Sequence, residues 1–235
     1  MKAKPLFIAD GHHRYETALA YRRLKREEAG DIAPSHAGFQ PYDAVLMLFS
    51  SLEDTGLTVL PTHRVLTASL APAGDLLHRL RSAFEIEEIV FDDQSESATR
   101  ARFLSSLRAK GTSDTVFGLA VKGATRYFLL TLRADRRPAP DATERDKLDV
   151  SILQAQVLSM LCPSPTEQDA IVYTKDDHEA LDFARQGKAE AALLLNPTKV
   201  SEVRAVAASG GRMPHKSTYF FPKPLTGLVI NVMQE

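Results

Sequence analysis

Cysteine is almost absent from this chain. Among 235 residues only Cys162 is a cysteine, which excludes an intrachain disulfide framework and a CxxC zinc or redox site. A single thiol fits a reducing compartment, so we expect a cytoplasmic protein. We interpret Cys162, in an apolar helix just before Pro163, as a small buried hydrophobic side chain.

The sequence also lacks a long hydrophobic run and an excess of charge of either sign. No apolar stretch approaches the roughly 20 residues of a membrane helix, so no membrane partner is expected. With 29 basic and 30 acidic residues, the formal net charge is −1, which gives no overall field to attract nucleic acid. The basic runs at 22–26 and 133–137 are interleaved with or followed by acids, so we do not expect nucleic-acid binding.

What is present is the composition of a globular protein. Hydrophobic residues make up 44% of the chain and charged residues 25%, enough for one large or two modest domains. Helix-like and strand-like segments alternate, which predicts an α/β fold, with α+β as the alternative. The charged, proline-bearing stretch 133–140 is the best linker candidate. It predicts an N-terminal α/β unit over 1–138 and a C-terminal α/β unit over 139–235.

Hydrophobic periodicity predicts the individual elements. Short apolar runs at 6–9 and 44–49 predict buried strands, the first followed by a glycine turn and a helix that ends near Gly30. A short extended piece is expected at 56–61. Further strands are expected at 85–91, 116–121, 126–132, 170–173, 190–195 and 228–232, and helices at 76–84, 95–110, 148–161, 177–185 and 200–208.

The first turn carries the sharpest cluster of chemical groups, Asp10-Gly11-His12-His13-Arg14. If a strand precedes it and a helix follows, Gly11 turns the chain and the free backbone N–H groups of residues 12–14 can hold a phosphate. Arg14 and His13 would add donors, and Asp10 could bind a metal ion or a hydroxyl group. The alternative is a tight turn with partly exposed histidines. We take Asp10 and His13 as the candidate catalytic residues.

Two further places could contact an anion. His63 and Arg64 follow a short extended segment and could line the same pocket, although a surface turn with a solvated arginine is an equal alternative.

A zinc site built from His12, Glu16 and His63 can also be drawn, but no HExxH motif or its inverted form is present.

The third place is the loop 210–217, in the sequence Gly-Gly-Arg-Met-Pro-His-Lys-Ser. It resembles a Walker A loop only superficially, because His215 stands where the second glycine is needed and no helix can follow. Lys216, with Lys223 nearby, could still contact an anion. The alternative is a structural loop fixed by the aromatic side chains at 219–221.

Several motifs resemble those of the uncharacterised bacterial and archaeal family DUF1015. They are Phe-Ile-Ala-Asp-Gly-His-His-Arg-Tyr-Glu-Thr-Ala-Leu at 7–19, Leu-Pro-Thr-His-Arg-Val at 60–65, Leu-Asp-Val-Ser-Ile-Leu at 148–153 and the stretch 213–227. Members of that family usually carry a substantial region before the first motif. The resemblance therefore implies that this chain is the C-terminal part of a longer protein, without the upstream half of its first unit.

The first motif is also similar to the phosphate-binding element of the ParB and sulfiredoxin superfamily, which includes free-serine kinases with an Asp-Gly-His-His-Arg sequence. This resemblance implies that nucleotide phosphate is held by residues 11–14, with Asp10 near the metal or the acceptor hydroxyl. Sulfiredoxin needs a cysteine where His12 stands, so sulfinic-acid reduction is not expected. The kinases take a catalytic glutamate from an upstream segment that has no counterpart here.

These observations lead to one expected function and two alternatives. A glycine turn, a helix N-terminus, His and Arg donors and an acid suit phosphoryl transfer, which depends on positioning and charge neutralisation. We expect a nucleoside di- or triphosphate with Mg²⁺ as cofactor and a small hydroxyl compound as substrate. The main alternative is a non-enzymatic, nucleotide-gated regulatory module of the ParB kind, and the third is a metal-dependent hydrolase. The sequence does not identify the general base.

Overall fold

The structure is a computed structural model that describes residues 6–30, 39–54, 56–67, 73–161, 170–225 and 227–230. Cys162, and residues 231–232 of the last expected strand, lie outside these ranges. The chain divides into two compact units. Unit 1 combines the two ends of the chain, residues 1–58 and 220–235, and unit 2 is the continuous segment 59–219.

Unit 2 is built on one antiparallel sheet with the strand order β3-β5-β4-β7-β2-β6. Strands β7 and β6, which follow residue 138, pair with strands that precede it, so the predicted boundary between 138 and 139 does not match the division. The expected linker lies inside unit 2 and forms the short helix η2, Ala134–Arg136. The strands are β2 His63–Leu66, β3 Phe84–Val90, β4 Val116–Val121, β5 Arg126–Leu132, β6 Ile171–Thr174 and β7 Ala191–Leu194.

The central strands β5, β4, β7 and β2 of this sheet bury both of their faces, whereas the edge strands β3 and β6 leave several residues exposed. Neighbouring residues such as Val65 and Leu66 belong to different core clusters, because successive side chains of a strand point to opposite faces. Tyr127 and Phe128 of β5 divide in the same way. Near-continuous apolar strands are therefore required, and the sequence supplies them in β4, β5 and β7.

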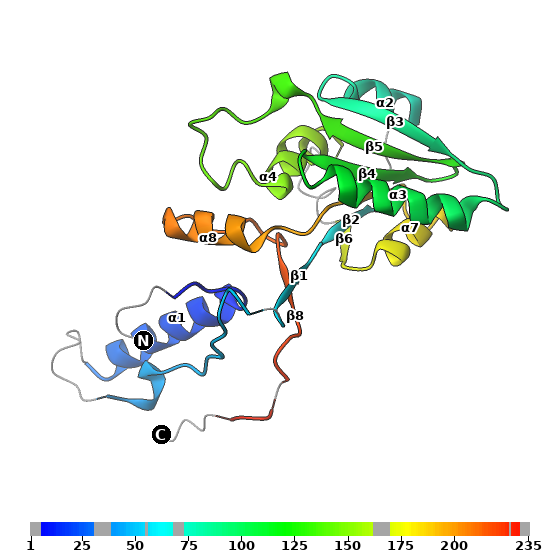
Figure 1. Ribbon diagram of the computed structural model, residues 1–235. Helices are drawn as coiled ribbons and strands as arrows, with labels where there is room; N and C mark the ends of the chain where they lie inside the picture. Colours follow the sequence, from blue (N-terminus) through cyan, green and yellow to red (C-terminus); the bar gives the residue numbers. More distant parts are fainter. Residues whose placement is uncertain are drawn as a thin grey trace. The chain divides into compact units, whose positions relative to one another are not determined.

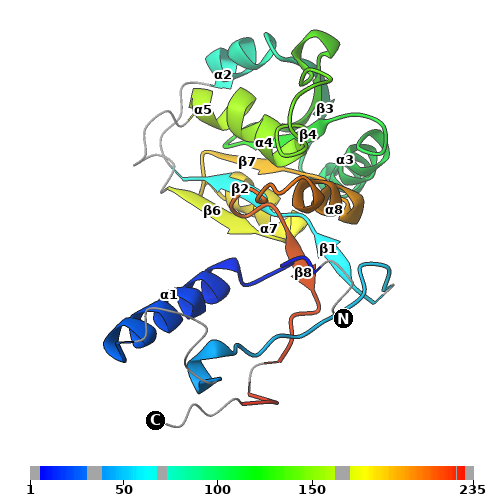
Figure 2. The same cartoon turned by 90° about the vertical axis from the view of Figure 1, so that its left-hand side faces the viewer.

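Helices cover both faces of the sheet, which confirms the expected α/β class. Figure 2 shows α2, α4 and α5 on one side of the sheet and α7 on the other, and α3 packs with α7 in the second core cluster. The expected helix 76–84 ends early, because Phe84 begins β3. The helices are α2 Ala73–Leu80, α3 Glu96–Lys110, α4 Asp149–Leu153, α5 Ser159–Leu161, α7 Asp177–Arg185 and α8 Val200–Ala208.

The helix expected over 148–161 is present, with one change in its winding. Between α4 and α5 the chain forms a π-helical turn, η3, over Gln154–Leu158. Val157 and Leu158 within this turn are buried in the first core cluster. The wider π-helical turn therefore keeps these apolar side chains packed against the sheet. Hydrophobic periodicity predicts the helix but not this change in its winding.

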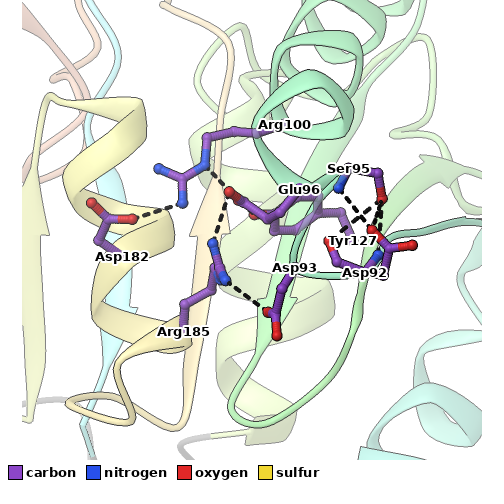
Figure 3. Close-up of polar contacts among 8 residues, drawn as sticks. All are labelled: Asp92, Asp93, Ser95, Glu96, Arg100, Tyr127, Asp182 and Arg185. Atoms are coloured by element: carbon purple, nitrogen blue, oxygen red, sulfur yellow. Dashed lines mark hydrogen bonds and ion pairs between the residues drawn. The ribbon is translucent and has the colours of Figure 1, made fainter.

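A buried polar network joins α3, α7 and β5 (Figure 3). Oε1 of Glu96 accepts hydrogen bonds from Nε of Arg100, at 2.7 Å, and from the Tyr127 hydroxyl. Its other oxygen lies 2.7 Å from Nη1 of Arg185. Arg100 also donates to Asp182 of α7 at 2.7 Å. Each buried charge here has a partner, so the network fixes the packing of the two helices.

Unit 1 contains the long helix α1, His12–Glu28, and the short helix η1, Pro41–Asp43 (Figure 1). Nη2 of Arg26 lies 2.6 Å from Oδ2 of Asp43, with both side chains mostly buried. The Arg26 guanidinium also lies 5.9 Å from the centre of the Tyr42 ring. These contacts attach η1 to the C-terminal part of α1.

Three strand predictions in unit 1 are wrong. Residues 6–9 and 44–49 form no strand, and neither do residues 228–230. The run 44–49 is exposed, with Leu48 at 74% and Leu46 at 56% exposure. An apolar run becomes a strand only when a neighbouring strand takes up its hydrogen bonds, and no described strand pairs with these runs.

The two units join where the chain crosses between them twice. Both crossings fall in a two-stranded sheet formed by β1, Thr58–Leu60, and β8, Tyr219–Phe221. Strand β1 lies within the extended piece expected at 56–61. Across the described ranges, no helix has the length and apolar character needed to cross a bilayer.

Candidate functional site

The turn before α1 has the backbone geometry that its sequence predicts. Gly11 is the N-cap residue with φ 83° and ψ 27°, a left-handed conformation that glycine adopts without strain. A Cβ atom at this position would lie 2.8 Å from Nη2 of Arg14. Glycine is therefore needed for the direction of the chain, whereas an added Cβ would only displace the exposed, flexible end of the Arg14 side chain.

The N-terminus of α1 has no side-chain cap. The first backbone bond runs from the N–H of Tyr15 to the carbonyl of Gly11, at 3.0 Å, so the N–H groups of residues 12–14 precede the helical hydrogen bonds. No acidic residue lies in the first turn. The side chains of His12, His13 and Arg14 are exposed. Open N–H donors, basic side chains and the positive end of the helix dipole together favour an anion.

Asp10 is bound by two cations. Its Oδ2 lies 3.2 Å from Nη2 of Arg14 and 2.9 Å from Nζ of Lys223. Partial burial opposes ionisation of Asp10, but Lys223 and Arg14 outweigh this effect and lower its pKa below the usual value. Asp10 is thus a carboxylate at neutral pH. Sequence analysis had placed Lys223 only as a neighbour of Lys216, and nothing local in the sequence links it to Asp10.

Asp10 could supply one ligand to a metal ion, but it does not belong to a complete metal site. In the ranges that the structure covers, no group of three or more His, Cys, Asp or Glu side chains could hold a metal ion. Mg²⁺ in nucleotide sites is commonly held by one or two carboxylates together with substrate phosphates and water. Asp10 would therefore hold Mg²⁺ only together with the phosphates of a nucleotide.

His63 lies in the interior of unit 2 and is fully buried. The backbone N–H of Leu195 donates to its Nδ1 at 3.2 Å, so the ring proton must be on Nε2. Nε2 lies 2.9 Å from Oδ1 of Asp177, without the alignment of a good hydrogen bond. Burial opposes ionisation of Asp177, but His63 and Arg108 outweigh it and lower the Asp177 pKa. Both ring nitrogens face protein groups, so His63 does not join His12 and Glu16 in a zinc site.

Arg64 is also buried, at 3% exposure, so the interpretation of it as a solvated surface arginine is wrong. Its guanidinium donates to the carbonyls of Thr62 and Lys216, the latter at 3.0 Å. It lies 5.5 Å from the centre of the Tyr173 ring, and Nζ of Lys216 lies 6.0 Å from the same centre. Strand β2 thus brings Arg64 to the Lys216 loop.

The sequence-predicted residues therefore form two groups. Unit 1 brings together the residues of the first turn and adds Lys223. Unit 2 brings Arg64 and Lys216 together, with His63 next to Arg64 on the same strand. Sequence analysis missed Tyr173, whose signal was only its position in a short apolar strand, and Asp177 in the first turn of α7.

Solved structures resemble the chain only distantly. A conserved hypothetical protein from Pyrococcus furiosus aligns with a TM-score of 0.42 and 15% identity, over 91% of this chain and 68% of that one. A free serine kinase in complex with AMP aligns with a TM-score of 0.43 and 14% identity, over 91% and 66%. A mutant free serine kinase in complex with ADP gives a TM-score of 0.41, 16% identity and the same coverage. The chain thus spans about two thirds of these structures.

No curated protein matches the sequence. One family does match, over residues 1–151, and its description is a protein of unknown function, DUF1015. The match covers the glycine turn, α1, β2 and the strands up to β5. Because it covers more than half of the 235 residues, the chain belongs to the DUF1015 family.

Proposed function

We propose that this chain binds the phosphate groups of a nucleoside di- or triphosphate at the turn formed by residues 10–14. The observation that carries the proposal is the left-handed Gly11 at the start of an uncapped helix, with Arg14 folded over it. The open N–H groups of residues 12–14 would bind phosphate oxygens, and His12, His13 and Arg14 would add positive charge or donors. Because His63 is fully buried, it would not contact the nucleotide and would affect binding only through neighbouring residues.

The same turn can support transfer of the terminal phosphoryl group to a small hydroxyl compound. In this step the hydroxyl oxygen of the acceptor forms a bond to the terminal phosphorus, and the bond from phosphorus to the bridging oxygen breaks. The hydroxyl proton passes to the imidazole of His13, and the shortened nucleotide leaves. Asp10 would orient the acceptor hydroxyl or hold Mg²⁺, which would neutralise phosphate charge. Arg14 and Lys223 would then release Asp10 and bind phosphate oxygens instead.

The bond between Asp10 and Lys223 favours a second candidate, a nucleotide-gated regulatory module. A phosphate group at the turn competes with Asp10 for Lys223, which lies in the C-terminal segment of unit 1. Binding would then release that segment without any chemical reaction. The two candidates share the phosphate site and differ in whether a phosphorylated product forms.

Calorimetric titration tests the shared site. ATP, ADP and CTP are titrated with magnesium into the parent chain, Arg14→Ala and Arg23→Ala. Arg23 is an exposed arginine on the same helix and serves as the matched control. We expect Arg14→Ala to weaken binding about tenfold or more, because a charged hydrogen bond to phosphate contributes roughly 1.5–3 kcal/mol. Equal affinity in all three proteins, or none in the parent, would contradict the proposal.

Phosphorus NMR separates the two candidates once binding is established. The protein is incubated with ATP, magnesium and a panel of small hydroxyl compounds. A new phosphomonoester signal that is absent with His13→Gln supports phosphotransfer. Unchanged ATP, together with faster hydrogen exchange around Lys223 when nucleotide is bound, supports the regulatory module.

A further inference from the structure

The second group of basic residues, in unit 2, has an unbalanced charge. Arg64 is buried at 3% exposure, and its two hydrogen bonds go to backbone carbonyls of Thr62 and Lys216. No carboxylate of the described residues lies within ion-pair distance of its guanidinium. A buried charge normally has a partner of opposite sign, because removal from water is costly. Burial indeed lowers the pKa of Arg64 to about 10.

Lys216 places a second cation at the aromatic ring that Arg64 contacts. Its ammonium and the Arg64 guanidinium both lie within about 6 Å of the centre of the Tyr173 ring, at 6.0 and 5.5 Å. The His215 ring contacts the same tyrosine edge to face, at 6.4 Å between ring centres. Lys216 and His215 are exposed, so the Lys216 ammonium is open to solvent.

The backbone of the loop is shaped to keep Lys216 in this place. Lys216 has φ 53°, a left-handed conformation that side chains other than glycine and asparagine rarely adopt. Arg64 binds the carbonyl of this residue, which helps to hold the turn. A lysine kept at such a position, next to an arginine without a counter-ion, indicates a site that its ligand completes.

We propose that Arg64 and Lys216 form an oxyanion site in unit 2 that takes the phosphate or carboxylate group of a small molecule. The anion contacts the Lys216 ammonium at the surface and neutralises the buried guanidinium beneath. The field of Arg64 is weakly screened because the group is buried, and it therefore adds to affinity without the direct exposure that a surface arginine needs. This site does not require the nucleotide site at residues 10–14.

The test is titration of the full chain with inorganic phosphate, and separately with malonate as the carboxylate probe. The parent and Arg14→Ala are both titrated, and the further variants are made in the Arg14→Ala background, where the first turn contributes little. We expect saturable binding of at least one probe at one equivalent, and the more tightly bound probe identifies the class of ligand. Lys216→Gly keeps the left-handed backbone and removes the ammonium, and we expect it to weaken binding tenfold or more. Lys147→Ala, an exposed lysine elsewhere in unit 2, should leave binding unchanged.

Arg64→Gln is the second variant, and thermal unfolding with and without the probe shows whether it folds. In the Arg14→Ala background the bound probe should raise the melting temperature, and after the added Lys216→Gly change it should not. Equal affinity of Lys216→Gly and its background overturns the inference, whatever Arg64→Gln does. Phosphate that binds the parent but not Arg14→Ala also overturns it, and leaves the proposed nucleotide site intact. Phosphate binding to Arg14→Ala, with no nucleotide bound by the parent, supports this site and contradicts the nucleotide proposal.

Discussion

Lys223 binds Asp10 although 213 positions (223 − 10) separate them in the sequence, with Nζ 2.9 Å from Oδ2. Lys223→Met should therefore raise the Asp10 pKa towards its usual value, because a hydrogen bond and a positive charge are lost. Carboxyl-carbon NMR of the titrating protein measures this pKa. Any stability that the pair contributes is present above the pKa of an unfolded aspartate and is lost as pH falls through the lower folded value. Lys188→Met should leave the Asp10 titration unchanged.

Gly11→Ala should destabilise unit 1 and impair the phosphate site. Its φ of 83° alone costs a side chain about 1 kcal/mol, and the new Cβ would displace the flexible end of the Arg14 side chain, whose Nη2 would lie 2.8 Å away. Gly30→Ala is the matched control, because Gly30 also has a positive φ, 69°, but no atom within 4 Å of the added Cβ. Urea unfolding and nucleotide titration of both variants give the comparison. If the two variants bind nucleotide equally well, the contact between Gly11 and Arg14 has no part in binding.

Asp149→Asn should stabilise the protein above pH 6. Burial raises the Asp149 pKa to about 6, although the hydroxyl of Thr115 donates to it at 2.9 Å. A raised folded pKa means that stability is highest below the unfolded pKa near 4 and falls as pH rises through about 6. The gain in Asp149→Asn should be roughly 1–3 kcal/mol at pH 8 and should vanish near pH 4. Urea unfolding at both pH values measures it, with the exposed Asp141→Asn as control.

Glu96→Gln should be strongly destabilising. The change leaves Arg100 and Arg185 without the carboxylate that lies 2.7 Å from each, in a mostly buried network (Figure 3). Removing one partner of a buried ion pair should cost roughly 2–4 kcal/mol, measured by urea unfolding. Glu144→Gln removes the exposed pair with Lys147 and should change stability by less than about 1 kcal/mol. Similar losses in both variants would mean that burial of the network has no effect.

Most of unit 2 could be predicted because its apolar patterns are satisfied within the unit. The hairpin of β4 and β5, the helices α3, α7 and α8, and the strands β6 and β7 lie where periodicity placed them. The strand order could not be predicted, because it depends on pairing between segments far apart in sequence. Leu119 of β4, for instance, pairs with Leu193 of β7. Because β4 and β7 pair across the charged, proline-bearing stretch 133–140, that stretch lies inside one unit and does not mark a boundary.

Unit 1 was predicted less well, and the reason is physical. The turn at residues 10–14 followed from local chemistry, since glycine and the start of a helix are local features. The run 44–49 has the composition of a buried strand, but composition does not supply a strand to pair with it. The links from Asp10 to Lys223 and from Arg64 to Lys216 depend on tertiary structure, which no local pattern encodes.

The division of the chain also sets an order for its biosynthesis. Residues 1–58 are translated before unit 2, but the rest of unit 1, residues 220–235, is made only after the whole of unit 2. During translation, unit 2 can fold as one continuous segment, whereas Asp10 can pair with Lys223 only after the whole of unit 2 has been made. A nascent chain stalled before residue 220 would carry the glycine turn without its second cation. The complete Asp10 site can therefore form only after the segment that follows unit 2 has been synthesised.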